Sequence, residues 1–346
     1  MAIKCILKKH RRRIKKIFSV AGGHFQKRCV ILATETQNQK DKNMFKITNG
    51  GLLKRETTWN GLIFGSPKSG KTSLAASFSK PILIDLDHGA HRVAGKDRAG
   101  LDVAAVDNWA DFEALCADSA LKDYKTIVVD TFGAAVDMVI RDKFGGIMNP
   151  AKWGTVKSDI MRVANQLKMT GRSVLWLAHE SEDKSDDKII KRPQCQGKAK
   201  DELMKMLDFI GHTTKQGNDF VLEFGGDDSI YVGNTFGFKN RYVLPDIRVE
   251  NNTFGRDVIE KQIVDFLESE EQANESLRTT MTACRDVIAQ AASAEDFTNA
   301  LATITSAELT TGAILKLKHE LADKAAECGC AWNKDAKAFE KQPKAE

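Results

Sequence analysis

The sequence predicts an α/β fold, in which helices cover both faces of a mostly parallel sheet and a smaller helical module follows. Short apolar runs alternate with helix-like stretches between about residues 57 and 179. Such continuous apolar runs are typical of parallel strands that are buried on both faces. Beyond residue 251 the aromatic residues become sparse and no strand pattern is evident, which predicts a helical end of the chain.

The first predicted strand leads into a glycine-rich loop. Its apolar run, Gly61–Phe64, is followed by GSPKSGKT at Gly65–Thr72, which matches the complete GxxxxGKT pattern of a phosphate-binding loop. Thr72–Phe78 then continues as a helix-forming stretch, so the motif has the strand and the helix that it needs. Glycines let backbone N–H groups turn toward phosphate oxygens, and the helix adds the positive end of its dipole. We therefore predict a nucleotide-binding loop formed by Gly65, Ser66, Pro67, Lys68, Ser69, Gly70, Lys71, Thr72 and Ser73.

The remaining elements follow in order along the chain. The expected strands after the loop are Pro81–Asp87, Asp102–Val106, Thr126–Asp130 and Ser173–His179. The expected helices between them are 108–118, where Asn108 can act as the N-cap, 134–143 and 153–169. From 208 to 243, short strands such as 220–224 and 229–232 are separated by glycine turns, which predicts an antiparallel extension of the sheet. Helices at about 257–271, 275–291, 294–303 and 311–328 predict a small bundle, with Ser293 and Ser306 as helix starts.

Two aspartates end predicted strands near the loop. Asp130 follows Lys71 by about sixty residues, and a carboxylate at the carboxyl end of a parallel strand faces the phosphate crevice. There it would orient Mg²⁺ through water while the Thr72 hydroxyl binds the ion and Lys71 reaches the β- and γ-phosphates. Asp87 would polarise the attacking water, whereas Asp85 has the opposite pleat orientation and is expected to be structural. These residues predict ATP and Mg²⁺ as ligands.

The strand that ends at His179 is followed by a polar segment, Glu180–Lys200. We expect His179 to contact the γ-phosphate and to report its presence to this segment. Its basic residues predict a loop that binds single-stranded DNA, and they are Lys184, Lys188, Lys191, Arg192, Lys198 and Lys200. The acidic residues in the same segment favour the alternative, in which His179 caps a strand and the loop is solvated. A second candidate loop, 141–152, precedes Trp153, which would either stack on a base or pack in the core.

A pair of cations lies near the end of the predicted sheet. Lys239 and Arg241 are one residue apart on an extended segment and therefore project to the same side. In an ATPase that works at subunit interfaces they could reach the γ-phosphate of a neighbouring subunit, which predicts a homo-oligomer. The alternative is a solvated basic edge.

Charge divides the chain further. Residues 1–43 carry twelve Lys and Arg against two acidic residues, a net charge of +10, so the remaining chain carries −5 of the overall +5. We expect 1–43 to be a basic disordered extension, with a nucleic-acid arm or a targeting segment as alternatives. The main body does not have the charge of a globally basic nucleic-acid binder. The expected domains are a core at 44–250, a helical module at 251–333 that could bind a partner, and a charged tail at 334–346.

Composition disfavours secreted and membrane proteins. The chain is 42% hydrophobic and 29% charged, as in globular proteins, and no apolar run approaches the roughly 18–20 residues that span a bilayer. Its seven cysteines are scattered, which indicates a reducing compartment without a disulfide framework. We therefore expect a cytoplasmic protein with no membrane contact.

The order of these motifs resembles that of the RecA-like ATPases. Gly65–Thr72 is similar to their phosphate loop, Ile84–His88 to the strand with their catalytic acid, and Ile127–Asp130 to the strand with their magnesium aspartate. Leu177–His179 lies where RecA has a glutamine-ended strand that gates its DNA loop. Lys239–Arg241 is similar to the paired-cation finger of ring helicases. A group of bacteriophage nucleotide-binding proteins, often linked to single-strand annealing and recombination, also shares PKSGKT, Ala-His-Glu and Asn-Arg-Tyr-x-Leu-Pro.

The resemblance covers about residues 49–249. It implies a RecA-like core, ATP with Mg²⁺, assembly as a ring or filament on single-stranded DNA, and location in the host cytoplasm for a phage protein. The chain departs from the family pattern because histidine replaces the usual glutamine, the second acid is shorter and the DNA loops are not strongly basic. Two other functions stay open: a nucleotide-gated module that hydrolyses slowly and recruits a partner through 257–330, and a ring-forming DNA translocase or helicase.

Overall fold

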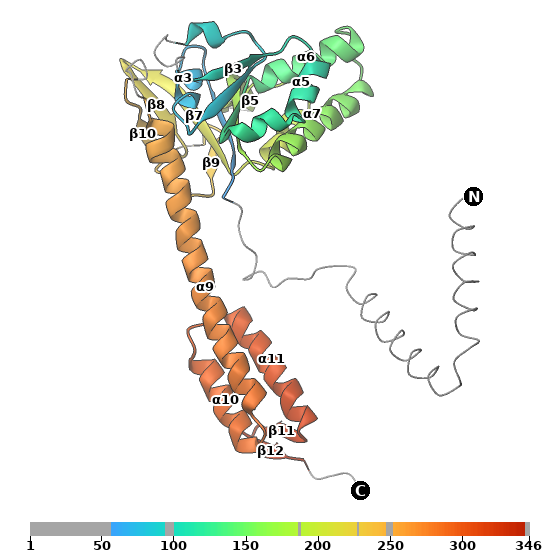
Figure 1. Ribbon diagram of the computed structural model, residues 1–346, viewed down its shortest axis with the longest axis vertical. Coiled ribbons are helices and arrows are strands. Elements are labelled where there is room, and N and C mark those ends of the chain that lie inside the picture. Colours follow the sequence, from blue (N-terminus) through green and yellow to red (C-terminus); the bar gives the residue numbers. More distant parts are fainter. Residues whose placement is uncertain (1–56, 94–99, 186–187, 227, 247–251, 343–346) are drawn as a thin grey trace, which may run out of the picture. The chain divides into compact units, whose positions relative to one another are not determined.

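The computed structural model describes residues 57–93, 100–185, 188–226, 228–246 and 252–342 (Figure 1). The extension expected at 1–43 lies outside these ranges. Among the helices that are described, none has the length and apolar character that a membrane span requires.

The described part of the chain forms one ten-stranded mixed sheet, in the order β10–β8–β7–β1–β5–β4–β2–β3, with β6 paired to β5 and β9 to β7. The six strands from β7 to β3 in this order are parallel, and β6, β8, β9 and β10 pair antiparallel. This is the α/β architecture that the sequence predicts. The strands are β1 (Asn60–Gly65), β2 (Pro81–Asp85), β3 (Asp102–Ala105), β4 (Thr126–Asp130), β5 (Ser173–Ser185), β6 (Lys188–Pro193), β7 (Phe209–Gln216), β8 (Asp219–Glu223), β9 (Gly233–Asn234) and β10 (Arg241–Val243).

Helices cover both faces of this sheet, because alternate residues of each strand point to opposite sides. In β1, Leu62 and Phe64 belong to a first apolar cluster, and Ile63 belongs to a second one. The first cluster is covered by α5 (Trp109–Cys116), α6 (Phe132–Phe144), α7 (Lys152–Met169) and α8 (Ala199–Met204), and Figure 1 shows α5, α6 and α7 side by side. The second is covered by α3 (Lys71–Ala75) and by the beginning of α9 (Lys261–Gln290).

Two N-caps fix helices next to strands. The Asn108 side chain accepts a hydrogen bond from the Asp111 N–H, as the sequence predicts for α5. Thr131 caps α6 in the same way through the Ala134 N–H, so the helix begins immediately after the strand that ends at Asp130. Short 3₁₀ turns, η2 (Ala90–Arg92) and η3 (Ser119–Asp123), complete the connections.

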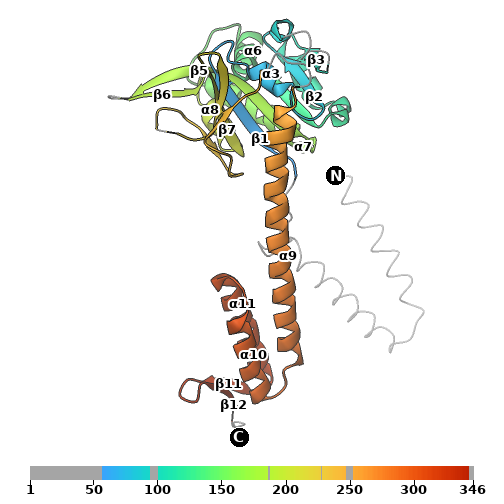
Figure 2. The same cartoon turned by 90° about the vertical axis from the view of Figure 1, so that its left-hand side faces the viewer.

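The segment expected as a loop after His179 is largely a β-hairpin. Strand β5 continues to Ser185 and pairs antiparallel with β6, so that Glu180 lies opposite Pro193 and Lys184 opposite Ile189. Figure 2 shows this hairpin extending away from the rest of the sheet. The prediction of a loop was wrong because the hairpin carries charged residues on both faces and its two isoleucines, Ile189 and Ile190, are adjacent, so the apolar alternation that marks a half-buried strand is missing.

The antiparallel extension was predicted only in part. Strand β7 is parallel to β1, and the antiparallel strands begin with β8. The strand expected at 229–232 is wrong, because Ile230 makes only an isolated bridge with Lys191 and the next strand begins at Gly233.

The C-terminal region is helical, as predicted, with different boundaries. It contains a π-helical turn, η4 (Gly255–Glu260), then α9, α10 (Ala294–Ser306) and α11 (Thr311–Glu327), and ends in a hairpin of β11 (Cys330–Asn333) and β12 (Ala338–Lys341). The two helices expected at 257–271 and 275–291 form one continuous helix. Ser293 begins α10 with a capping box, whereas the start expected at Ser306 is wrong because α11 has Thr310 as its N-cap. Part of the expected charged tail forms β12.

A third apolar cluster lies in this region. Helices α9, α10 and α11 contribute to it through residues such as Cys284, Phe297 and Leu317, and the hairpin contributes Phe339. The first part of α9 belongs to the second cluster of the core through Ile263 and Leu267. One helix therefore carries residues of two apolar cores.

Candidate nucleotide-binding site

The phosphate loop turns sharply between β1 and α3. Gly70 has a φ of 87°, which glycine adopts without steric cost, and Lys68 adopts a φ of 64°. A Cβ on Gly65 would lie 2.1 Å from the Thr213 carbonyl oxygen of β7, so only glycine fits where the loop leaves the sheet. The Ser69 hydroxyl contacts the Thr213 hydroxyl at 2.8 Å and ties the loop to the same strand.

The Lys71 side chain lies inside this turn. Its Nζ donates hydrogen bonds of 2.9 Å to the carbonyl oxygens of Gly65 and Ser66, and only 6% of the residue is exposed. Burial lowers the pKa of Lys71, and the negative charges of Asp130, Asp87 and Glu180 oppose this shift. The ammonium group is thus held at the loop by acceptors that a phosphate oxygen can replace.

Thr72 and Asp130 form the second pair of the site. The Thr72 hydroxyl donates to Asp130 Oδ2 at 2.8 Å, which brings the start of α3 to the carboxyl end of β4. Asp130 is nearly fully buried, and burial raises its pKa to about 6, although the bond from Thr72 acts in the opposite direction. A hydroxyl beside a carboxylate is the hard-oxygen donor set that suits Mg²⁺.

The two acids after β2 have different surroundings. Asp85 is buried and accepts hydrogen bonds from the backbone N–H groups of Gly89 (2.9 Å) and Ala90 (3.0 Å), which fits the structural place expected for it. Asp87 faces the phosphate loop, and its Oδ2 lies 3.9 Å from His179 Nε2. The nearby His179 imidazole, together with the hydrogen bond that Asp87 Oδ1 accepts from the Gly89 N–H at 3.0 Å, holds the pKa of Asp87 below its usual range, so this carboxylate is ionised near neutral pH.

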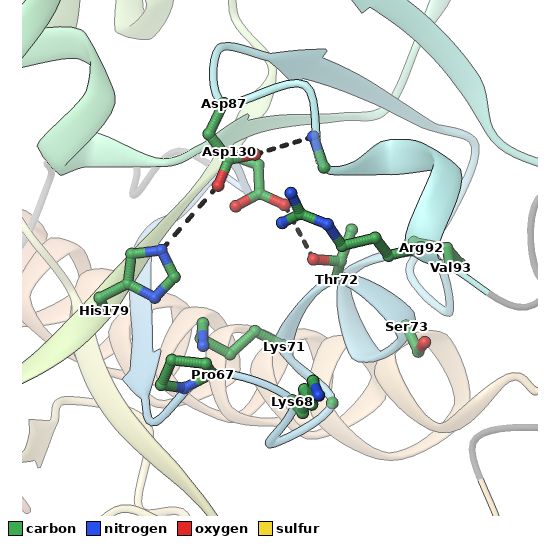
Figure 3. A pocket seen from close by; sticks show the side chains of 12 residues that line it. Pro67, Lys68, Lys71, Thr72, Ser73, Asp87, Arg92, Val93, Asp130 and His179 are labelled. Carbon is green, nitrogen blue, oxygen red and sulfur yellow. Dashed lines mark hydrogen bonds and ion pairs between the residues drawn. The ribbon is translucent and has the colours of Figure 1, made fainter.

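His179 lies between Asp87 and the phosphate loop (Figure 3). Its Nδ1 atom is buried and has no hydrogen-bond partner among the residues that the structure describes. A buried imidazole nitrogen without a partner fits a ligand that supplies one. A phosphate oxygen of a bound nucleotide is such a ligand.

These groups line one cavity of about 410 Å³, which is drawn in Figure 3. It brings together six of the nine residues predicted in the phosphate loop with residues from three separate strand ends, whereas Gly65, Ser66 and Ser69 do not line it. Three further residues, Gly89, Arg92 and Val93, line it from the turn that follows β2. The sequence analysis did not predict Arg92 as a site residue. In the sequence, Arg92 is marked only as a basic residue a few positions after a strand that ends in acidic residues. The full lining is Pro67, Lys68, Gly70, Lys71, Thr72, Ser73, Asp87, Gly89, Arg92, Val93, Asp130 and His179.

Lys239 and Arg241 do not line this cavity. Both are exposed, and Arg241 donates to the Gln216 side chain at 2.6 Å, across the antiparallel edge of the sheet. Both cations therefore lie at an exposed edge of the sheet, outside the cavity.

The basic residues of the hairpin segment have different partners. Lys191 Nζ lies 3.4 Å from Glu180, and Arg192 lies 3.4 Å from Asp183 with its guanidinium 5.2 Å from the centre of the Tyr231 ring. Lys184 and Lys198 are exposed and Lys200 is half-buried in α8, while the Lys188 side chain lies outside what the structure describes. In the second candidate loop, Trp153 packs partly buried against the first apolar cluster.

A buried polar cluster behind the loop was not predicted. His212 of β7 is 1% exposed and lies between Glu180 (2.6 Å) and Glu223 (3.2 Å). No local pattern marks these three residues as partners, because each comes from a different strand.

Comparison with known proteins agrees with this geometry. The family described as "AAA domain" matches residues 57–242, more than half of the chain. The SPbeta prophage-derived uncharacterized protein YorG of Bacillus subtilis (strain 168) is 23% identical over 239 residues, which is 61% of this chain and 67% of that protein. The matched range contains the phosphate loop, both cavity aspartates and the hairpin. The chain therefore belongs to the AAA-domain family, and its core is an α/β P-loop NTPase core.

Proposed function

We propose that this protein binds ATP with Mg²⁺, hydrolyses it, and is stimulated by single-stranded DNA during phage recombination or annealing. The observation that carries the nucleotide part is the convergence of Lys71, Thr72, Asp87, Asp130 and His179 on one cavity. The sequence separates these residues, the parallel strands bring them to one edge, and a nucleotide at the carboxyl edge of a parallel sheet is the ligand that this arrangement supports.

Each residue has a place in this proposal. The Lys71 ammonium moves from the Gly65 and Ser66 carbonyls to the β- and γ-phosphates, because phosphate oxygens carry more negative charge. Thr72 and Asp130 would hold Mg²⁺, which supplies charge stabilisation to the transferring phosphoryl group when bound. Asp87 is ionised and orients the attacking water, while the unpartnered Nδ1 of His179 receives the γ-phosphate.

The hairpin supports single-stranded DNA as the second ligand. The hairpin continues strand β5, which carries His179. The residue that we propose to contact the γ-phosphate is therefore adjacent to the base of the hairpin. Its lysines and Arg192 provide phosphate contacts, and the Arg192–Tyr231 pair offers a flat surface on which a base can stack. The prophage origin of a relative favours a phage setting.

A direct test is ATP turnover by the full chain with and without single-stranded DNA. Lys71→Ala is expected to lower turnover at least about 100-fold and to weaken ATP binding, because the buried cation is lost. Lys122→Ala removes an exposed lysine outside the cavity and serves as the control. Unchanged ATP affinity in Lys71→Ala would refute the site. Slow turnover that DNA does not change would favour the partner-recruiting module, and unwinding without annealing would favour a helicase.

The proposal includes assembly as a ring or filament, in which Lys239 and Arg241 complete the site of a neighbouring subunit. Their exposure and their absence from the cavity of their own chain support this arrangement. Arg241→Glu is expected to abolish turnover and to leave ATP binding intact. Wild-type turnover in this variant would remove the trans-acting role. The C-terminal module is proposed as a surface for a further protein partner.

A further inference from the structure

His212 joins two carboxylates immediately beside the phosphate loop. It pairs with Phe64 in the β1–β7 register, and the two rings are 4.9 Å apart. Nε2 lies 2.6 Å from Glu180 Oε2 and Nδ1 lies 3.2 Å from Glu223 Oε2. A neutral imidazole can donate from only one nitrogen, so two such contacts require one extra proton in the cluster. The cluster therefore fixes one oxygen of Glu180 in a buried, charge-assisted hydrogen bond.

The other oxygen of Glu180 faces two competing donors. The Ser66 hydroxyl of the phosphate loop donates to Oε1 at 3.4 Å, and Lys191 Nζ of the hairpin lies 3.4 Å from the same atom. Both distances are at the long end of the range for hydrogen bonds, so either contact can shorten if the other is lost. The Ser66 carbonyl also accepts from Lys71, so a shift of Ser66 changes the surroundings of the lysine that we assign to the phosphates.

Glu180 and His179 are neighbours with opposite orientations. His179 points to the nucleotide cavity, and Glu180 points to the other side of β5, as successive strand residues do. The Glu180 carboxylate also acts electrostatically on Lys71, because its charge opposes the effect of burial there. Glu180, at the base of the hairpin, thus contacts Lys191 of the hairpin, Ser66 of the phosphate loop and the buried His212.

We propose that Glu180 is a positioning residue that couples polyanion binding at the hairpin to the phosphate loop. When a DNA phosphate takes the Lys191 ammonium, Oε1 of Glu180 is left to Ser66, which draws the loop backbone toward Glu180 and frees Lys71 for the nucleotide. This inference rests on the proposed function, because it assumes DNA-stimulated ATP turnover. His212 and Glu223 hold Glu180 in place while its partner changes.

The test compares Glu180→Gln, Ser66→Ala and the control Glu182→Gln in the full chain. Glu182 lies two residues away, is exposed and faces Lys191 across the hairpin, so its variant removes the same charge from the same strand. Three quantities are measured for each: basal ATP turnover, affinity for oligo(dT), and the ratio of turnover with and without oligo(dT). Thermal unfolding shows that each variant is folded.

We expect Glu180→Gln to bind oligo(dT) at least as well as wild type and to keep basal turnover, and Ser66→Ala to bind oligo(dT) at least as well as wild type. The stimulation ratio is expected to fall by at least about fivefold, the lower end of typical coupling between sites. Glu182→Gln keeps the wild-type ratio. A merely structural role of Glu180 would lower all three quantities together, and that result overturns the proposal.

Failure of the coupling and failure of the proposed function give different experimental results. If wild type is stimulated by oligo(dT) and Glu180→Gln is stimulated equally, the coupling is wrong and the proposed function stands. If Glu180→Gln loses oligo(dT) binding, Glu180 acts only within the hairpin and the coupling is again wrong. If wild type hydrolyses ATP without any response to oligo(dT), both the coupling and the DNA part of the proposed function are wrong.

Discussion

The nucleotide-binding core and the C-terminal module bury different kinds of side chain. Among the described residues, every buried polar or charged side chain lies in the core, between Ser69 and Thr213. The third cluster, in the C-terminal module, is built from apolar residues and cysteines. The buried polar residues are Ser69, Lys71, Ser77, Asp85, Thr126, Asp130, Thr131, Asp159, Ser173, His212 and Thr213.

The core therefore contains buried polar side chains, whereas the module is stabilised by apolar packing. Each buried polar group costs about 1–3 kcal/mol unless a partner satisfies it, so an apolar core is the less expensive way to stabilise a domain. In the core, Lys71 is satisfied by the loop backbone, Asp130 by the Thr72 hydroxyl, and His212 by Glu180 and Glu223. Lys71 and Asp130, whose pKa values burial shifts, both line the cavity, which is typical of functional sites.

The largest effect is expected from a comparison between a buried carboxylate that lines the cavity and one that lies outside it. Asp130→Asn is expected to lower ATP turnover by about 10²–10³-fold, because a charged ligand next to the transferring phosphate is lost. Asp159 is equally buried but contacts Lys143 (2.8 Å) and Arg162 (2.8 Å) instead of the cavity. Asp159→Asn is therefore expected to lower stability and to leave the turnover of folded protein unchanged. Equal loss of turnover in both variants would break the comparison.

The next prediction concerns the apolar core of the module. Phe297→Ala removes a fully buried ring and is expected to cost about 3–5 kcal/mol of stability in the module. Hydrogen exchange should increase in the region of the third cluster and stay unchanged around the phosphate loop. Phe112→Ala, at a fully buried position in the core, should show the opposite pattern. An equal increase in both regions for either variant would mean that they unfold as one unit.

A smaller effect is expected where the core meets the beginning of α9. A Cβ on Gly255 would lie 2.5 Å from the Phe78 ring, and the Gly255 N–H donates to the Ser77 hydroxyl at 2.8 Å. Gly255→Ala is expected to cost about 1–3 kcal/mol through overpacking. Gly312 lies in α11, and a Cβ added there would meet no atom within 4 Å. Gly312→Ala should therefore raise stability by roughly 0.5–1 kcal/mol. Chemical denaturation of both variants measures the contrast, and equal signs would contradict it.

The smallest expected effect is a pH dependence at the cavity. The pKa of Asp87 is lower in the folded protein than in the unfolded chain, so its contact with His179 adds stability above the unfolded pKa. This contribution disappears as the pH falls below about 4, through the folded pKa. Asp87→Asn should therefore lose under about 1 kcal/mol at pH 7, since the pair is partly exposed, and progressively less as the pH falls through the folded pKa. A stability difference that increases toward acid pH would contradict this prediction.

The sequence by itself determined the phosphate loop, the first five strands along the chain and the aspartates near the ends of two of them. These signals are local: a glycine pattern, continuous apolar runs and the residue that follows each run. Thr126–Asp130 is observed with the predicted bounds, and the loop, Asp87, Asp130 and His179 meet at one cavity. The parallel order of the strands makes this meeting a consequence of the fold, since their carboxyl ends share one edge.

Only the tertiary structure decided the hairpin after His179, the single long helix α9 and the cluster around His212. Polar strands such as β6 have no apolar alternation, and their pairing is what makes them strands. His212, Glu180 and Glu223 are partners because β5, β7 and β8 pass near one another, although 32 residues separate the first two. Local sequence patterns encode elements and their chemical ends, whereas contacts between distant residues exist only after the chain has folded.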